Sequence, residues 1–249
     1  MSTDGKDQQN QLDNEEGKRQ PIFNLPAIVA VIAGLFLAIQ AAQSLVLNER
    51  GQLELLAWFA FIPYVALHPD YLPGGWFTLL WTPVTHAFLH AGWEHVILNT
   101  VWFAIFATPL TQRYGGGRMV LLFLAGAIVG AAAFAATTLP GQSLLVGASG
   151  GVAALTGAAI RFIFQPLQIG VNRQTGERIV LGRKLATLRE VLAHPTARIF
   201  TLVWLALNAV VPLLPLFISG MDVSIAWQAH LGGFVAGFFL VPFLEGRQS

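Results

Sequence analysis

Two polar residues with the chemistry of a nucleophile and a base stand in long apolar stretches of this 249-residue chain. Ser149 lies in Gly147-Ala148-Ser149-Gly150-Gly151, inside the charge-free run 119–160. His230 lies in a second charge-free run, 223–244. A serine hydroxyl becomes a good nucleophile when a neighbouring base takes its proton, and histidine is the commonest base. The pair predicts nucleophilic catalysis, provided that the fold brings both residues together at one depth.

Each residue also has an interpretation without chemistry. The small residues around Ser149 are typical of close helix packing in membranes, and a neighbouring carbonyl could satisfy His230. In favour of a catalytic site, Gly147 and Gly150 have no side chain that would block access of a substrate carbonyl to the Ser149 hydroxyl. They also leave the backbone N–H groups at the helix start available to donate to an oxyanion. Ionisable residues within spans are functional candidates by default. Gly233 and Gly237 share the helix face of His230 and would let its helix press against the serine helix.

A third polar group precedes and opens another apolar stretch: His86, His90, His95 and Asn99. His95 and Asn99 are four residues apart and therefore share a helix face. One hypothesis is a metal site, because histidine is the commonest metal ligand; the group lacks a carboxylate partner, since Glu94 beside His95 points elsewhere. The other hypothesis makes His95 and Asn99 donors to a developing oxyanion, while His86 and His90 pack and hydrogen-bond within the loop.

The composition indicates a polytopic membrane protein. Hydrophobic residues make up 55% of the chain and charged residues only 11%, against about 25% charged in soluble domains. There is no cysteine, which excludes disulfides, thiolate nucleophiles and cysteine-ligated metals. Residues 1–22 are polar and predict a disordered tail, with no signal peptide visible before the first apolar run. The net charge of +1 gives no reason to expect nucleic acid as a partner.

A helix needs about 20 apolar residues to cross a bilayer. Residues 23–245 therefore predict an all-α fold of six membrane-spanning helices, at about 25–47, 92–110, 119–138, 147–165, 198–218 and 227–244. Residues 48–91 are rich in aromatic side chains and broken by four prolines. They predict a first loop whose short helices lie in the membrane interface.

The basic residues predict the orientation. Of the 14 Lys and Arg residues, only Arg50 falls on the side opposite the two termini, so both termini should be cytoplasmic. The basic connection 166–197 is then cytoplasmic, with a surface helix over 184–194 and a solvated loop as alternatives. In this topology Ser149, His230, His95 and Asn99 all lie near the outer start of their spans. The site would open toward the extracytoplasmic side.

At these residues the chain resembles the rhomboid family of intramembrane serine proteases, in its bacterial six-helix form. The matching segments are His86-x-x-x-His90-x-x-x-x-His95-x-x-x-Asn99, Gly147-Ala148-Ser149-Gly150, and Ala229-His230-Leu231-Gly232-Gly233 continued to Gly237. The resemblance implies a protease of the bacterial inner membrane that cleaves peptide bonds in or beside transmembrane segments. Ser149 would be the nucleophile, His230 the general base, and His95 with Asn99 the oxyanion donors. No metal or cofactor is implied.

Some features depart from the family pattern or stay open. Ala153 stands where the family often has a tyrosine stacked on the histidine, so another group must hold the His230 ring. No acidic residue is placed to do this, which favours a Ser–His dyad over a triad. The alternative functions are a silent relative that binds transmembrane segments and a small transporter. Substrates of a protease would be membrane proteins with helix-weakening residues such as Gly or Pro in their spans. The oligomeric state is not predicted.

Overall fold

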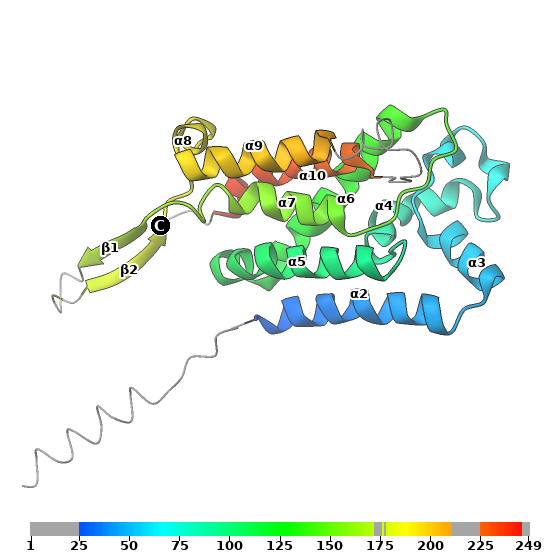
Figure 1. Cartoon of the computed structure of the whole chain (residues 1–249), viewed down its shortest axis with the longest axis horizontal. Helices are drawn as coiled ribbons and strands as arrows, with labels where there is room; N and C mark the ends of the chain where they lie inside the picture. Colours follow the sequence, from blue (N-terminus) through cyan, green and yellow to red (C-terminus); the bar gives the residue numbers. More distant parts are fainter. Residues whose placement is uncertain (1–24, 172–175, 177, 211–224, 246–249) are drawn as a thin grey trace, which may run out of the picture.

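The computed structural model describes residues 25–171, 176, 178–210 and 225–245. Long helices run side by side along one axis (Figure 1): α2 (Ala27–Leu45), α5 (Trp93–Tyr114), α6 (Gly116–Thr138), α7 (Ser149–Ala159), α9 (Pro195–Val210) and α10 (Trp227–Leu240). Each of these helices lies at one of the six predicted spans. Among the described helices, α2, α6 and the segment Trp227–Leu244 are long and apolar enough to cross a membrane. Membrane crossing by the other helices stays a prediction.

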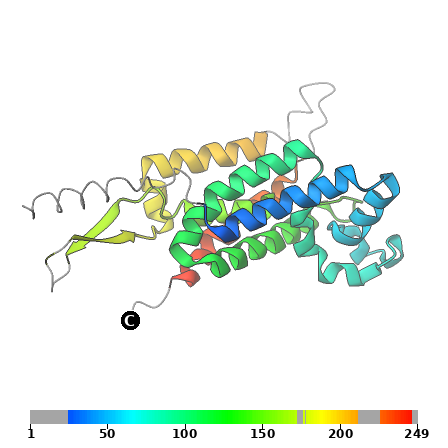
Figure 2. The ribbon, with the colours of Figure 1, turned by 90° about the horizontal axis from the view of Figure 1, so that it is seen from below.

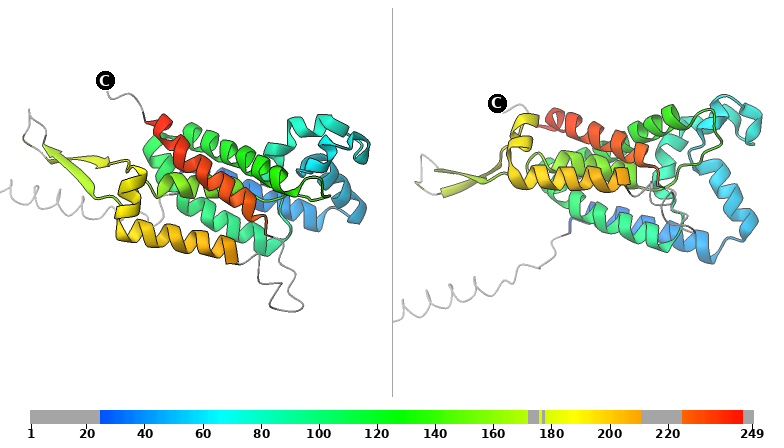
Figure 3. Two further views of the ribbon diagram at one scale, coloured as in Figure 1. Left: turned by 90° about the horizontal axis from the view of Figure 1, so that it is seen from above. Right: turned by 45° about the horizontal axis from the view of Figure 1, so that its top comes forward.

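Helix α7 lies at the centre of the bundle. All of its residues from Gly150 to Ala159 are buried, and it packs against α5, α6 and α10 (Figure 3). Helix α2 packs on the outer side of α5 (Figure 2). The small side chains of α7 allow this: a methyl group on Gly157 would lie 2.2 Å from Phe234 O, and one on Gly151 would lie 2.5 Å from the Phe123 ring. Helices in membranes associate through such close backbone approach.

The prediction of a helix over 147–165 is wrong in its length. Helix α7 has 11 residues, so it rises roughly 16 Å, about half the thickness of a bilayer's hydrocarbon core. Gly147 precedes it with a φ of +119°, in a region that residues with a Cβ avoid. At the other end, Arg161 N–H bonds back three residues to Ala158 O, which tightens the chain after the last helical turn.

The connection 166–197 corrects the prediction of an all-α fold. Strands β1 (Leu167–Val171) and β2 (Arg178–Arg183) pair as an antiparallel hairpin, and a short helix α8 (Leu188–Ala193) follows. Ile and Val residues in both strands favour extended backbone. Helix α8 lies inside 184–194, where a helix was one of two alternatives. Thr187 and Glu190 form a capping box at its start.

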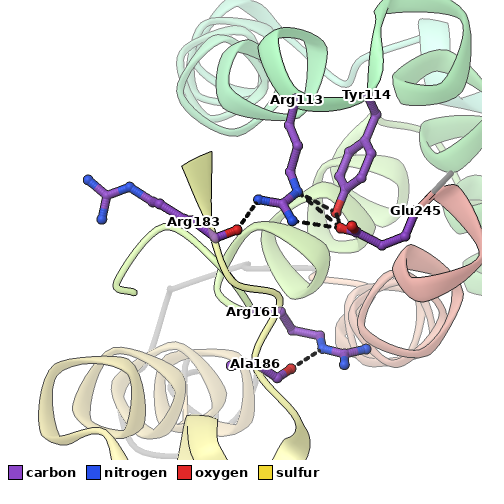
Figure 4. Close-up of polar contacts among 6 residues, drawn as sticks. All are labelled: Arg113, Tyr114, Arg161, Arg183, Ala186 and Glu245. Carbon is purple, nitrogen blue, oxygen red and sulfur yellow. Dashed lines mark hydrogen bonds and ion pairs between the residues drawn. The ribbon is translucent and has the colours of Figure 1, made fainter. Parts of the chain in front are cut away.

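Polar contacts fasten the hairpin end of the bundle (Figure 4). Glu245 Oε1 accepts hydrogen bonds from Arg113 Nη2 at 2.7 Å and from Tyr114 Oη at 2.6 Å. These bonds join the end of α5 to the residue that follows the short helix η6 (Val241–Leu244). Arg113 Nη1 also donates to Arg183 O at 2.5 Å, which anchors the hairpin. Burial favours the neutral Glu245 carboxyl, but the hydrogen bonds outweigh burial and hold its pKa below the ordinary value.

Arg161 makes a second fastening at this end. Its buried guanidinium donates from Nε to Ala186 O at 2.7 Å (Figure 4). It also donates from Nη1 to Phe238 O at 2.9 Å. The start of α2 lies here too, since a methyl group on Gly116 would lie 2.9 Å from Ile28 Cγ2. Both described ends of the chain therefore lie at one end of the bundle. The side of the membrane on which that end lies stays a prediction.

The first loop covers the opposite end of the bundle (Figure 1). It consists of short helical segments: α3 (Glu49–Phe59), η1 (Pro63–Ala66), η2 (Pro69–Tyr71), η3 (Gly75–Leu80), α4 (Thr82–Thr85) and η4 (His86–Phe88). Proline is the first residue of η1 and η2, where its missing N–H costs no helical hydrogen bond. The predicted short helices are present. Trp76, Phe77 and Leu80 are exposed on this loop, as expected of a segment that lies in the membrane interface. The depth of the loop in the membrane stays a prediction.

Candidate functional site

The segment that leads into Ser149 is held by the first loop. Phe61 N–H donates to Leu145 O at 3.1 Å, and Leu145 N–H donates to Phe61 O at 2.9 Å. Two residues later, Gly147 N–H donates to His86 O at 2.9 Å. These bonds fix the backbone just before the serine, so the loop at 48–91 positions the start of α7.

His86 and His90 are buried supports of that same segment, each only 1% exposed. Nε2 of His90 accepts a hydrogen bond from Ala148 N–H at 3.4 Å. Burial lowers the pKa of His86 to about 4. Burial, and secondly repulsion between the protonated forms of His90 and His95, lowers the pKa of His90 to about 3. Both rings are therefore neutral at pH 7, as the acceptor role of His90 requires.

Ser149 is the first residue of α7 and is half-buried. The first helical hydrogen bond here runs from Val152 N–H to Ala148 O at 2.9 Å, so the amides of Ser149 and Gly150 precede it. Amides in the first turn of a helix have no partner within the helix, and the helix dipole favours negative charge beside them. The serine hydroxyl thus stands next to backbone donors suited to an oxyanion.

His95, in the first turn of α5, approaches this segment from the neighbouring helix. A methyl group on Gly147 would lie 2.8 Å from His95 Nε2 and 3.7 Å from Ser149 Oγ, so the ring and the hydroxyl border one small volume. Ala91 N–H donates to His95 Nδ1 at 3.3 Å, which assigns the proton of the neutral ring to Nε2. Buried Asn99 donates from Nδ2 to His95 O at 3.0 Å and keeps a second amide proton.

His230 lies in the first turn of α10, and the glycine face of this helix rests on α7. A methyl group on Gly233 would lie 2.0 Å from Gly150 O, and one on Gly237 would lie 1.8 Å from the main chain of α7. Neither position has room for a Cβ. The contact brings the turn that follows His230 against the residue that follows Ser149. No hydrogen bond joins the two side chains themselves, although both belong to the described residues.

A contact that was not predicted from the sequence holds the His230 ring. Nδ1 of His230 lies 2.6 Å from Oδ1 of Asn208, near the end of α9. Asn208 Nδ2 donates to Trp204 O at 2.8 Å, and the Trp204 ring stacks on Phe234 with centroids 4.6 Å apart. The available signal was an amide side chain in an otherwise apolar stretch, the same signal that singled out His230.

Two of the three histidines considered for a metal, His90 and His95, direct their bonded nitrogens at different backbone amides. Nε2 of His90 faces the amide of Ala148, whereas Nδ1 of His95 faces the amide of Ala91. Over the described residues, no group of three or more His, Cys, Asp or Glu side chains has an arrangement that could hold a metal ion. The nitrogens that make contacts here bond to the main chain.

These features define a helical membrane protein in which a serine at a helix start borders one small volume with a histidine of α5, while the helix turn that follows a histidine of α10 packs on the residue after the serine. A comparison with protein families matches residues 78–247 to the Rhomboid domain. The chain belongs to the rhomboid family.

Similar proteins carry the name of rhomboid proteases. The chain is 26% identical over 200 residues to "Rhomboid protease GlpG" of Yersinia pestis (strain Pestoides F), which covers 80% of this chain and 57% of that protein. It is 26% identical over 171 residues to the protein of the same name from Yersinia enterocolitica, which covers 68% of this chain and 50% of that protein. Human "Rhomboid-related protein 3" is 37% identical over 79 residues, which covers 32% of this chain and 19% of the human protein. The chain thus spans about half the length of the GlpG relatives that it matches.

Proposed function

We propose that the protein is an intramembrane serine endopeptidase that cleaves transmembrane segments of membrane-protein substrates. The family and the similarity to proteins named rhomboid proteases support this proposal. The observation that carries it is the contact of Gly233 with Gly150 O, which brings the helix turn of His230 to that of Ser149.

In the proposed reaction, Ser149 Oγ attacks the carbonyl carbon of the scissile bond while His230 Nε2 takes its proton. His230 then gives that proton to the leaving amine. The resulting acyl-enzyme is hydrolysed by a water from which the same imidazole takes a proton. Each step needs one base that alternates between its neutral and protonated forms, which a histidine near neutral pH provides.

The negative charge that develops on the substrate carbonyl needs donors on one side of the serine. Nε2–H of His95 borders the same small volume as Ser149 Oγ. The free amide proton of Asn99 and the first backbone amides of α7 are further donors. Donors that are already in place stabilise the transition state without reorganisation during the reaction.

The length of α7 supports a site below the membrane surface. Its far end is fastened by Arg161 at the polar end of the bundle, and its 11 residues rise roughly half of the hydrocarbon thickness. Ser149, the first residue of α7, would therefore lie inside the bilayer. The site would open toward the extracytoplasmic side of a bacterial inner membrane. An intact substrate helix hides its carbonyls in hydrogen bonds, so substrates should carry helix-weakening Gly or Pro residues near the cut.

The test is cleavage of a single-span substrate by the purified full chain. Ser149→Ala and His230→Ala should each abolish cleavage, and the double variant should be little worse, because nucleophile and base act as one unit. Ser143→Ala, in the connection before α7, is the matched control and should cleave normally. Substantial cleavage by Ser149→Ala would refute the assignment. A wild-type chain that binds such substrates but cuts none would indicate the silent relative instead.

A further inference from the structure

We propose that Asn208 is the positioning residue for His230. Its side-chain amide holds the imidazole in the tautomer that leaves Nε2 free to take the proton of Ser149. The proposal rests on the proposed function, and it adds a residue from α9 to a site otherwise built from the starts of α5, α7 and α10.

The hydrogen bonds of Asn208 determine which way its amide points. Nδ2 donates to Trp204 O at 2.8 Å, one turn back on the same helix, so the carbonyl oxygen Oδ1 is the atom directed at His230. A carbonyl oxygen only accepts, and a separation of 2.6 Å therefore requires a proton on His230 Nδ1. In a neutral imidazole the other nitrogen, Nε2, then carries the lone pair.

This contact is the hydrogen bond that orients the ring. Within the described part of the chain, the His230 side chain has Asn208 as its one hydrogen-bond partner. Ala153 offers a methyl group and no ring on which the imidazole could stack. Asn208 Oδ1 can also keep accepting from Nδ1–H after His230 becomes protonated, so the ring stays held throughout proton transfer.

The register of α9 on α10 places the amide. Ala197, Thr201, Trp204 and Asn208 recur at helical spacing on the side of α9 that is less exposed. Trp204 stacks on Phe234, which lies one turn after His230, and this pair aligns the end of α9 with the start of α10. Ala197 is the one fully buried residue of α9, and Trp204 packs on the cluster that contains Ala197, Phe234 and Phe238.

Three variants separate positioning from packing. Asn208→Leu keeps a similar volume but has no acceptor, whereas Asn208→Asp keeps an acceptor oxygen at the same distance from the backbone. Thr201→Val is the control, because among the described residues the Thr201 hydroxyl bonds to Ala197 O of its own helix, at 2.8 Å, and to no other group. Loss of one hydrogen bond to the base should lower kcat about tenfold in Asn208→Leu. KM should stay unchanged, Asn208→Asp should stay within about threefold of wild type, and Thr201→Val should match wild type.

Nitrogen NMR of histidine-labelled protein at pH 8 gives a readout that needs no activity. The His230 signals, identified by their loss in His230→Asn, should show a protonated Nδ1 and a bare Nε2 in the wild type, and a mixture of tautomers in Asn208→Leu. A wild-type ring protonated on Nε2 would overturn the proposal, even if Asn208→Leu failed to fold. Unchanged kcat and tautomer in Asn208→Leu would overturn it as well. If Ser149 proved inert, the tautomer would still decide the role of Asn208 separately from the proposed function.

Discussion

A methyl group added at Gly233 tests whether the contact of α7 with α10 positions the site. Built on the backbone, this carbon would lie 2.0 Å from Gly150 O and 2.9 Å from Gly150 C. Ordinary contact begins near 3.4 Å, so relief needs a separation of about 1.4 Å (3.4 minus 2.0) between the two backbones. No flexible side chain is available to absorb this movement, because both clashing atoms belong to the main chain of α7.

The displacement should reduce activity more than stability. A misplacement of about 1 Å between reacting groups costs about a hundredfold in rate, so Gly233→Ala should lose about two orders of magnitude in kcat/KM. Overpacking typically costs about 1–3 kcal/mol, and the better helix propensity of alanine returns about 1 kcal/mol of that. The variant should therefore stay folded, with a free energy of unfolding lower by about 0–2 kcal/mol.

Cleavage of a fluorogenic single-span substrate and unfolding in detergent mixtures measure the two effects. Gly34→Ala in α2 is the control, since apart from its chain neighbours and the backbone of its own helix no described atom lies within 4 Å of the added methyl group; it should gain stability and keep full activity. If Gly233→Ala cleaved at the wild-type rate, the close approach of α7 and α10 would not be what aligns Ser149 with His230.

Three further predictions concern the oxyanion, acid stability and topology. Asn99→Ala should lower kcat about a hundred- to a thousandfold, the usual cost of removing one oxyanion donor; unchanged turnover would leave Asn99 a packing role. In the folded protein the pKa values of His86 and His90 are about 4 and about 3, below the value of about 6.5 in the unfolded chain. The unfolded chain therefore binds more protons as the pH falls below about 6.5, and each histidine should lower the free energy of unfolding by about 1.4 kcal/mol per pH unit until its folded pKa is reached. Unfolding titrations between pH 7 and 4.5 measure this loss, and His86→Asn should reduce its slope. Since the chain has no cysteine, Gln142→Cys should react with an impermeant maleimide from outside the cell and Gln168→Cys only after permeabilisation; the opposite pattern would reverse the orientation.

The positions of the helices could be predicted because runs of apolar residues indicate where they lie in the sequence. Residues 27–45 are helical inside the predicted span 25–47, and the helix 116–138 contains the whole predicted span 119–138. The end of α7 could not be predicted in this way, because the residues that follow Ala159 are also largely apolar. It depends on distant partners: Arg161 bonds to Ala186 O and Phe238 O, and neither contact has a local signal.

The hairpin was not predicted, because the charged residues of β2 obscure the residue pattern typical of a strand. Arg178 and Arg183 bound β2, so the connection had the composition of a solvated basic loop. Its pairing with β1 depends on cross-strand contacts between residues that are 7 to 16 positions apart, such as Val171 with Arg178 and Leu167 with Arg183.

The candidate site was predictable in its residue types but not in its connections. Residue spacing placed His95, Ser149 and His230 each near the start of a predicted span, and the structure places them at the starts of α5, α7 and α10. The acceptor role of His90 and the contact of Asn208 with His230 both join segments distant in the chain. Such bonds follow from helix register, here set by the stacking of Trp204 on Phe234, and register has no local sequence signal.

Covalent labelling with a fluorophosphonate tests directly whether Ser149 is an activated nucleophile. The reagent reacts with a serine whose hydroxyl a base has activated, and mass spectrometry of the digested protein identifies the modified residue. We expect one adduct on Ser149, its complete loss in Ser149→Ala, and strongly reduced labelling in His230→Ala, while Ser143→Ala labels normally. Labelling that persists in Ser149→Ala, or an adduct on a different serine, would contradict a nucleophile at the start of α7.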